Sequence, residues 1–396
     1  MKALHVIPSL SPVHGGPSFA MALIAESLAR AGVEVDVATT DDDGRGRHAT
    51  VSHGVRTERN GYGVLHFPKQ TEFYKVSLPF KRWMTEHVCE YDLVHVHALF
   101  SHTSNCAARV ARRARVPYVV RPLGVLNRWG MENRRAFIKA LSFRLIERPI
   151  LRRAAAIHYT SRQEEREAEE LGVRAKGAIV PLGIDVERFR SLPDREEFFQ
   201  QFPAARDRDV ILFLSRIDPK KGIELLLPAF ARVHERRAET LLVIAGDGKP
   251  EYVSELRESA KRLRLESAVL WTGRLEGRDK MAAFAAATVF ALPSYSENFG
   301  IALVEALAAG LPCVTTEGVA VSDDICERDA GIVVRAETAP LVEALDRLLS
   351  SASLRMQVSA NARQLTIERF SMQAMGSALA LLYGQFVTPK RDTDQH

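Results

Sequence analysis

The sequence has few cysteines and no long apolar segment, and both absences exclude classes of protein. Its four cysteines, Cys89, Cys106, Cys313 and Cys326, show neither CxxC spacing nor a histidine cluster, which argues against a disulfide framework and a zinc site. No apolar run approaches the roughly 20 residues of a membrane-spanning helix. Pro8 interrupts the N-terminal apolar stretch too early for a secretory signal. We therefore expect a cytoplasmic protein, at most peripheral on the inner face of the cell membrane.

Several ligand-binding motifs are also missing. The chain contains neither GxGxxG nor GxxxxGK[ST], and the first absence disfavours a nicotinamide-dependent oxidoreductase. There is no clear DxD metal motif, because Asp41–Asp43 and Asp323–Asp324 fall in predicted loops. The remaining composition is that of an ordinary globular protein, with 396 residues, 46% hydrophobic, 26% charged and a net charge of +5. The length suggests two or three domains.

Two series of alternating apolar strands and amphipathic helices follow one another along the chain. The first begins with the strand ALHVI, the helix FAMALIAESLARAG and the strand VEVDVAT, and the second starts afresh near Arg208 with DVILFLSRID. Such alternation predicts parallel sheets in an α/β fold, whose ligands bind at the carboxyl ends of the strands. We predict two Rossmann-like domains, 1–186 and 187–371, with the binding site in the cleft between them. Within the first series we expect a strand over 92–100 and a helix from Glu132 to Arg153. Residues 372–387 should form a helix, and 388–396 a polar tail.

The stretch SENFGIALVEALAAG carries two acids, Glu297 in the loop before a mostly apolar helix and Glu305 two turns into that helix. The amides that begin this helix belong to Asn298, Phe299, Gly300 and Ile301. Helix amides bind phosphate, whereas carboxylates accept hydrogen bonds from hydroxyl groups. A nucleotide sugar offers both kinds of group. The alternative is structural: Glu297 caps the helix, and Glu305 pairs with a buried arginine.

Two further motifs fit the same kind of ligand. In SRIDPKKG, Arg216 and Lys221 follow a strand and could neutralise a diphosphate without a metal ion. A solvated basic turn is the alternative for this motif. In PVHGGPS, Gly15 and Gly16 would let the backbone approach a ligand closely.

Together these motifs resemble those of the retaining glycosyltransferases of family 4, which have the GT-B fold of two Rossmann-like domains facing each other across a deep cleft. ENFGIALVEALAAGLPCVTT resembles the family's paired-glutamate motif, SRIDPKKGIELLLPAF its donor-phosphate motif, and GGPSFAMALIAESLARAG its N-terminal glycine loop and helix. The resemblance extends from Met1 to about Val387.

The resemblance implies a role for each motif residue. Arg216 and Lys221 would bind the donor diphosphate, Glu305 the ribose hydroxyls, and Glu297 the donor sugar. The helix amides would bind sugar and phosphate, and Gly15 and Gly16 would cover the diphosphate from the first domain. The backbone of Arg274 and Leu275 would lie along the base. The last helix would cross back onto the first domain.

The sequence departs from the family's pattern at one position on the acceptor side. Many family members carry a histidine where this sequence has Leu123. Arg121 lies beside that position, and His97 ends the preceding strand, so both are candidates for acceptor-side roles. A histidine on an apolar strand is, however, more often a core residue.

The reaction that the resemblance implies is transfer of a hexose from a GDP- or UDP-linked sugar to an acceptor hydroxyl, with retention at the anomeric carbon and without a metal or cofactor. The acceptor would be a saccharide or lipid-linked saccharide of a cell-surface polysaccharide such as an exopolysaccharide, O-antigen or capsule. Glu297 is the one carboxylate placed near the sugar, so front-side attack, in which the leaving phosphate takes the acceptor's proton, is favoured over a covalent intermediate. A catalytically silent nucleotide-sugar-binding subunit remains an alternative.

A basic segment suggests a further partner. Residues 101–153 contain thirteen Arg or Lys but two Glu, and Phe137, Leu141 and Leu145 recur there at four-residue spacing. This pattern predicts contact with an anionic membrane surface or a lipid diphosphate. An ordinary amphipathic helix with a solvated basic face explains it equally well. Nucleic acid is not expected, because no aromatic stacking pattern accompanies the charge.

Overall fold

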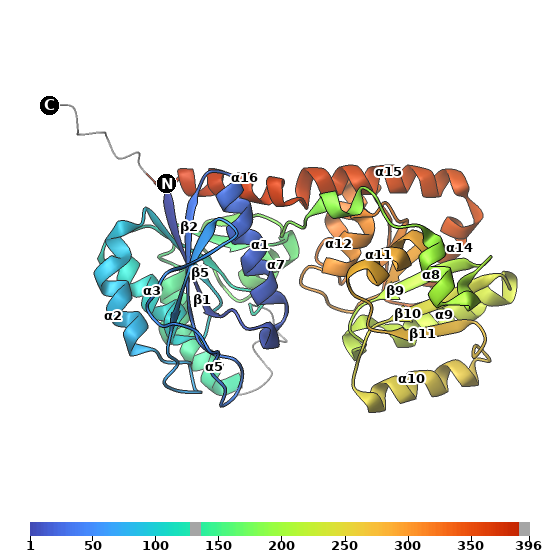
Figure 1. The fold of residues 1–396 in the computed structure, drawn as a ribbon, viewed down its shortest axis with the longest axis horizontal. Helices are drawn as coiled ribbons and strands as arrows, with labels where there is room; N and C mark the ends of the chain where they lie inside the picture. The colour runs from blue at the N-terminus through green and yellow to red at the C-terminus, as the bar shows by residue number, and fades with distance from the viewer. Residues whose placement is uncertain (127–135, 388–396) are drawn as a thin grey trace. The chain divides into compact units, whose positions relative to one another are not determined.

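The computed structural model describes residues 1–126 and 136–387, with side chains throughout these ranges except at 136–138. The chain divides into two compact units, Met1–Gly183 with Met372–His396, and Ile184–Ser371. Each unit contains one sheet with helices packed against it (Figure 1). The predicted α/β architecture with two parallel sheets is confirmed.

The sheet of the first unit has the strand order β3-β4-β2-β1-β5-β6-β7-β8. Neighbouring strands are parallel, except for the antiparallel pair β3 and β4. The strands span Lys2–Ser9 (β1), Glu34–Thr40 (β2), Thr57–Arg59 (β3), Tyr62–Phe67 (β4), Leu93–His97 (β5), Tyr118–Arg121 (β6), Ala156–Tyr159 (β7) and Gly177–Ile179 (β8). Its central strands are buried along their whole length because helices cover the sheet.

Serine side chains begin several helices of this unit, as the sequence pattern favours. Ser77, Ser101 and Ser161 accept hydrogen bonds from amides in the first turns of α2, α3 and α7. The helices span Gly16–Arg30 (α1), Leu78–His87 (α2), His102–Arg113 (α3), Ala136–Ser142 (α5), Arg148–Leu151 (α6), Arg162–Glu170 (α7) and Met372–Gly384 (α16). Short 3-10 turns occupy Pro12–His14 and Val88–Glu90.

The C-terminal helix α16 belongs to the first unit and packs along α1 (Figure 1). Gly376 allows this close approach, because a Cβ atom there would lie 2.3 Å from the backbone oxygen of Ser27. The predicted helix at 372–387 is thus found at Met372–Gly384. The predicted polar tail, 388–396, lies outside the described residues.

Two predicted elements of the first unit differ in detail. The helix expected from Glu132 to Arg153 is divided by the π-helical turn Phe143–Glu147 between α5 and α6, and residues 132–135 lie outside the described range. The strand expected over 92–100 ends at His97, because Ala98 and Phe100 have positive φ angles of 71° and 58°. A left-handed backbone cannot continue a strand.

The second unit has the strand order β11-β10-β9-β12-β13-β14, with all its neighbouring strands parallel. The strands span Asp209–Leu214 (β9), Thr240–Ala245 (β10), Val269–Gly273 (β11), Val289–Leu292 (β12), Cys313–Thr316 (β13) and Ile332–Val334 (β14). The helices span Arg195–Gln201 (α8), Ile223–Arg236 (α9), Pro250–Arg262 (α10), Gly277–Ala286 (α11), Ile301–Ala308 (α12), Ser322–Glu327 (α13), Thr338–Ser350 (α14) and Ala352–Arg369 (α15). Short 3-10 turns lie at Val186–Phe189, Pro203–Ala205 and Pro219–Lys221.

Candidate functional site

A cavity of about 830 Å³ lies at the carboxyl edge of the second sheet, where β9, β10 and β11 end. This is the edge at which parallel α/β sheets bind ligands. Four of the predicted site residues line it: Arg216, Arg274, Leu275 and Glu305. The other lining residues come mainly from the loops after the same strands and include Asp218, Asp247, Lys249, Glu276 and Lys280.

Two motifs that are about 75 positions apart in the sequence meet beside this cavity. The Lys221 ammonium group forms an ion pair with the Glu297 carboxylate. The backbone supports the same contact, because the amide of Tyr295 donates to the carbonyl oxygen of Lys220 at 2.8 Å. The phosphate-motif turn and the loop with the first glutamate therefore form one structural feature.

The position of Glu297 is fixed through its backbone. Its amide donates to the carbonyl oxygen of Gly318, and its own carbonyl oxygen accepts from the amide of Ala320, both at 2.9 Å. Three residues later Gly300, with a φ of 79°, precedes α12 as its N-cap. The amides at the start of a helix have no acceptor within the helix. Of the predicted residues, Gly300 and Ile301 lie at this helix start, whereas Asn298 and Phe299 precede the N-cap and belong to the loop before α12.

Lys221 is mostly buried, with 12% of its side chain exposed. Burial, together with the neighbouring Arg216 cation, lowers the pKa of Lys221 to about 8. The contact with Glu297 acts in the opposite direction, because an adjacent carboxylate favours the ammonium form. Desolvation is the largest single cause of the lowered pKa, and the nearby Asp218 carboxylate opposes it.

The second glutamate has a partner that sequence reasoning did not identify. Glu305 Oε1 lies 2.7 Å from the Nζ atom of Lys280, and 14% of the glutamate side chain is exposed. The structural alternative had foreseen a buried arginine in this place. Lys280 follows the strand that ends at Gly273, close to the predicted residues Arg274 and Leu275. The available signal was a cation in the first turn of α11, the helix that follows this strand.

The remaining predicted residues belong to the first unit. Gly15, with a φ of 69°, and Gly16 lie at the N-terminus of α1. His97 and Arg121 end β5 and β6 and are register partners in the sheet, so they lie side by side. Both are buried, with exposed fractions of 0% and 3%.

Leu123, which stands where the resemblance places a histidine, has a positive φ of 62°. The next amide, that of Gly124, donates to Glu164 Oε1 at 2.8 Å. Glu164 Oε2 in turn accepts from the amide of Thr160 at 2.8 Å. One buried carboxylate of α7 therefore holds the loop that follows β6.

A second cavity, of about 770 Å³, lies at the carboxyl edge of the first sheet, and sequence reasoning missed it. It is lined by charged groups and aromatic rings: His14, Asp42, Arg45, Glu72, Phe73, Tyr74, Lys75, Phe100 and Lys139, with Pro8, Gly44, Leu99, Ser101 and Ser142. Tyr74, Lys75 and Phe100 have positive φ angles of 61°, 48° and 58°. Backbone strain of this kind clusters at functional sites.

Asp42 anchors the charged wall of this cavity. Its carboxylate accepts hydrogen bonds from His14 Nε2 at 2.7 Å and from Lys69 Nζ at 2.8 Å, and it also pairs with Lys75. Burial alone would raise the pKa of Asp42, but the hydrogen bonds from Lys69 and Lys75 outweigh it and lower the pKa. The carboxylate is therefore ionised and holds the surrounding cations in place.

The basic segment 101–153 is described except for residues 127–135. Leu141 and Leu145 are 50% and 62% exposed, as an apolar surface stripe requires, whereas the side chain of Phe137 lies outside the described residues. Within the described parts of the chain, no helix combines the length and the apolar character needed to cross a membrane.

Two sequence families together match most of the chain. "Glycosyl transferases group 1" matches residues 194–365, and "Glycosyl transferase 4-like domain" matches residues 15–183. The chain is similar to the GDP-mannose-dependent alpha-(1-6)-phosphatidylinositol monomannoside mannosyltransferase of Mycolicibacterium smegmatis, with 27% identity over 60% of this chain and 65% of that protein. It is also 27% identical to the D-inositol 3-phosphate glycosyltransferase of Corynebacterium urealyticum, over 94% of this chain and 91% of that one.

Among solved structures, HepE from Anabaena in complex with UDP superposes with a TM-score of 0.75. The two sequences are 20% identical, and the match covers 97% of this chain and 100% of that chain. At this identity the similarity concerns the fold, which is that of GT-B proteins.

Proposed function

Because the chain belongs to the group 1 glycosyl transferases, we propose that it is an enzyme that transfers a hexose from a nucleoside diphosphate sugar to an acceptor hydroxyl group. One observation carries the proposal. The Lys221–Glu297 pair joins the phosphate motif to the start of α12 beside the cavity of the second unit. This arrangement combines cations, helix amides and a carboxylate, as a ligand with a diphosphate and sugar hydroxyls requires.

In this proposal Arg216 and Lys221 bind the diphosphate, and the amides of α12 complete the anion site. Glu305 binds the ribose hydroxyls, and the backbone of Arg274 and Leu275 borders the base. The place of Arg216, Glu305, Arg274 and Leu275 in the cavity wall supports their roles, and the ion pair with Glu297 supports that of Lys221. Gly15 and Gly16 of the first unit would cover the diphosphate, as the family resemblance implies.

The chemistry needs no metal ion in this proposal. The bond between the anomeric carbon and the diphosphate breaks, and the acceptor oxygen forms the new bond on the same face of the sugar. The acceptor proton passes to the leaving phosphate oxygen. Arg216 and Lys221 stabilise the negative charge that develops on the leaving group, and Glu297 stabilises the developing positive charge of the sugar ring. Retention of configuration follows from attack on that face.

The acceptor would bind in the first unit, and we propose a saccharide or lipid-linked saccharide of a cell-surface polysaccharide. The cavity of about 770 Å³ supports this, because aromatic rings at Phe73, Tyr74 and Phe100 suit sugar faces. His97 and Arg121 would lie on the acceptor side. The similar mycolicibacterial protein is named for an acceptor that is itself a glycolipid.

Segment 101–153 would bring the enzyme to an anionic membrane surface on the cytoplasmic side. Its cations and the exposed Leu141 and Leu145 support this proposal. A lipid-linked acceptor would then be presented at that surface.

The identity of the donor's base is tested by measuring the thermal stability of the protein with GDP, with UDP and with GDP- and UDP-linked sugars. A ligand at 100 times its dissociation constant stabilises the folded protein by about 2.7 kcal/mol, so the correct donor should raise the melting temperature clearly. Turnover is then measured with that donor in the presence of EDTA. Activity that EDTA abolishes and Mg²⁺ or Mn²⁺ restores would contradict metal independence.

Arg216→Ala and Lys221→Ala should each lower kcat by about 10²–10³, the loss expected when one preorganised donor is removed. Arg278→Ala is a matched control, because this arginine of the same unit is 74% exposed and pairs with Glu197. Near-native turnover in either test variant would mean that the diphosphate binds elsewhere. Binding of the donor without any transfer by the purified chain would favour a catalytically silent subunit.

A further inference from the structure

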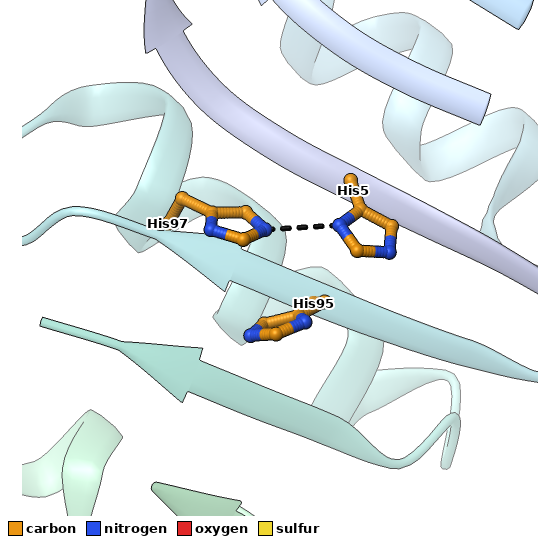
Figure 2. Close-up of side chains that lie close together, drawn as sticks. All are labelled: His5, His95 and His97. Carbon is orange, nitrogen blue, oxygen red and sulfur yellow. Dashed lines mark hydrogen bonds between the residues drawn. The ribbon is translucent and has the colours of Figure 1, made fainter. Parts of the chain in front are cut away.

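Four histidines gather inside the first unit, on three strands of its sheet. His5 lies on β1, His95 and His97 on β5, and His158 on β7, and all four have no exposed surface. Figure 2 shows His5, His95 and His97 side by side. The rings of His95 and His97 are stacked, with centroids 4.3 Å apart. Four imidazoles in one apolar interior need hydrogen-bond partners, because an unpaired buried polar group is costly.

These rings form one continuous chain of hydrogen bonds with Tyr383 of α16. His158 Nε2 lies 2.8 Å from the carbonyl oxygen of Val180, and His158 Nδ1 lies 3.4 Å from His95 Nε2. His95 Nδ1 lies 2.6 Å from the Tyr383 hydroxyl, which is 3.3 Å from His5 Nε2. The last contact, between His5 Nδ1 and His97 Nε2, is 2.9 Å and is the dashed line in Figure 2.

The backbone carbonyl at one end gives this chain a direction. A carbonyl oxygen only accepts, so His158 must carry its proton on Nε2, and its Nδ1 then accepts from His95. His95 Nδ1 consequently accepts from the Tyr383 hydroxyl. The hydroxyl oxygen accepts from His5 Nε2, and His5 Nδ1 accepts from His97 Nε2. All four histidines of this hydrogen-bond chain are therefore Nε2–H tautomers.

This reasoning holds for neutral rings, and the surroundings keep them neutral. Burial lowers the pKa of His5 and His158 to about 3, and it lowers the pKa values of His95 and His97 well below the ordinary range. Arg121 contributes in the same direction in all four cases. Burial also lowers the pKa of Arg121, but only to about 10, so it remains a cation at neutral pH.

The hydrogen-bond chain ends at His97, whose Nδ1 atom keeps a free lone pair, and Arg121 is the neighbouring hydrogen-bond donor. His97 Nδ1 and Arg121 Nε are both buried and have no hydrogen-bond partner, and the two residues are register partners at the carboxyl ends of β5 and β6. Two residues further along, Leu99, Phe100 and Ser101 line the first unit's cavity.

A metal ion explains the cluster less well. One nitrogen each of His5, His95 and His97 could serve as a ligand, and these atoms lie within 4.8 Å of one another. However, both nitrogens of His5 and both nitrogens of His95 are already engaged in the hydrogen-bond chain. The Arg121 cation beside them would also repel a second positive charge.

We infer that Tyr383 is a positioning residue, which holds His97 as the Nε2–H tautomer through His5 and so leaves His97 Nδ1 as a buried hydrogen-bond acceptor at the carboxyl end of β5, two residues before the segment that lines the first unit's cavity. The effect on substrate rests on the proposed acceptor-side role of His97. The tautomer itself does not depend on that role. The C-terminal helix thus contributes to the site through one phenolic oxygen.

The first test is a nitrogen NMR spectrum of the wild-type protein labelled with ¹⁵N-histidine, assigned with single His→Gln variants. Imidazole nitrogen shifts distinguish the two tautomers and the charged form. We expect four neutral Nε2–H rings for His5, His95, His97 and His158 at pH 7. A charged ring or an Nδ1–H tautomer at any of the four overturns the inference. Broadening or shifts of the three clustered rings on addition of Zn²⁺ would overturn it in favour of a metal site.

The second test is Tyr383→Phe, with Tyr118→Phe as the matched control. Tyr118 is also buried in the first unit, and its hydroxyl donates one hydrogen bond, to the carbonyl oxygen of Ile150 at 2.8 Å. We expect the tautomer ratio of His97 to change by about fivefold in Tyr383→Phe, the factor of one ordinary hydrogen bond, and to stay unchanged in the control. An unchanged ratio in both variants overturns the inference. If Tyr383→Phe does not fold, the wild-type spectrum still decides.

The third measurement separates positioning from simple destabilisation. In Tyr383→Phe, kcat/KM for the acceptor should fall several-fold while the affinity for nucleoside diphosphate stays within about twofold, because only the acceptor side is altered. A changed tautomer with unchanged kcat/KM would overturn the positioning role. Failure of the proposed function is distinguishable, because the wild-type protein would then show no transfer although its tautomers are as expected.

Discussion

At the scale of single residues, the contact between Lys221 and Glu297 has the clearest chemical consequence. A lysine whose pKa is lowered to about 8 loses its charge as the pH rises through that value. The loss removes one of the two cations proposed for the diphosphate.

We therefore predict that kcat/KM for the donor falls as the pH rises through about 8. The pH dependence of kcat/KM reports groups of the free enzyme, and Lys221 is protonated and active below its pKa. In Lys221→Arg the charge persists, so this fall should disappear even if the absolute rate is lower. A pH–rate profile of both proteins is the measurement. An identical alkaline limb in the two profiles would contradict the role of Lys221.

The two glutamates should respond differently to the same substitution. Glu305→Gln should weaken the binding of nucleoside diphosphate, because losing a charge-assisted hydrogen bond costs about 1.5–3 kcal/mol. Glu297→Gln should leave that affinity within about threefold but lower kcat strongly, since the sugar's charge develops in the transition state. Calorimetric titration and steady-state kinetics provide the two measurements.

Lys280→Gln is the matched control for Glu305→Gln. It breaks the same ion pair, of 2.7 Å, from the other side but leaves the carboxylate in place. If the pair is merely structural, both variants should lose melting temperature alike, and neither should discriminate between ligands. Such parallel losses would remove Glu305 from the proposed site.

At the scale of elements, the turn between β9 and α9 decides where Lys221 lies. Gly222 ends the 3-10 turn Pro219–Lys221 and precedes α9 with a φ of 67°. A Cβ atom at this position would lie 2.1 Å from the carbonyl oxygen of Pro293, which follows β12. Two loops of the second unit are thus packed together without room for any side chain.

Gly222→Ala should destabilise the protein by at least about 1–2 kcal/mol, the cost of a left-handed residue with a side chain, and should lower kcat by moving Lys221. Thermal unfolding and turnover measure the two effects. Gly384→Ala is the control, because a Cβ atom there meets nothing within 4 Å. Wild-type stability and rate in Gly222→Ala would show that the turn adapts and that its geometry does not set the site.

At the scale of the whole molecule, the charge is concentrated rather than evenly spread. The chain carries a net charge of +5, yet residues 101–153 contain thirteen Arg or Lys but two Glu. A basic residue near an anionic membrane contributes about 1 kcal/mol. Exposed leucines at 141 and 145 could add apolar insertion to this attraction.

We predict that the protein cosediments with vesicles containing phosphatidylserine or phosphatidylglycerol, less so at high salt, and not with neutral phosphatidylcholine vesicles. Leu141→Ser with Leu145→Ser should weaken binding at least about fivefold, because burying a leucine contributes on the order of 1.5–3 kcal/mol. Met356→Ser with Ile367→Ser is the control, since these residues are 69% and 59% exposed on α15. Equal binding of both double variants would mean that the leucines do not insert.

Sequence reasoning was sufficient for the fold and the family. The alternation of apolar strands and amphipathic helices is a local property, and it predicted two parallel α/β sheets, which is confirmed. The two motifs around Arg216 and Glu297 are also local, so they could be read without knowing how they meet. The roles of their residues remain predictions, and so does the cleft between the domains.

Only the tertiary structure decided which side chains are partners. Lys221 and Glu297 are 76 positions apart, and Lys280 and Glu305 are 25 apart, so no periodicity relates them. The sequence suggested that His97 was a core histidine, and it is buried. Its network joins residues 5, 95, 97, 158 and 383, which become neighbours because parallel strands and α16 bring distant segments side by side. Local pattern determines the elements, whereas the order of strands in the sheet determines which side chains share an interior.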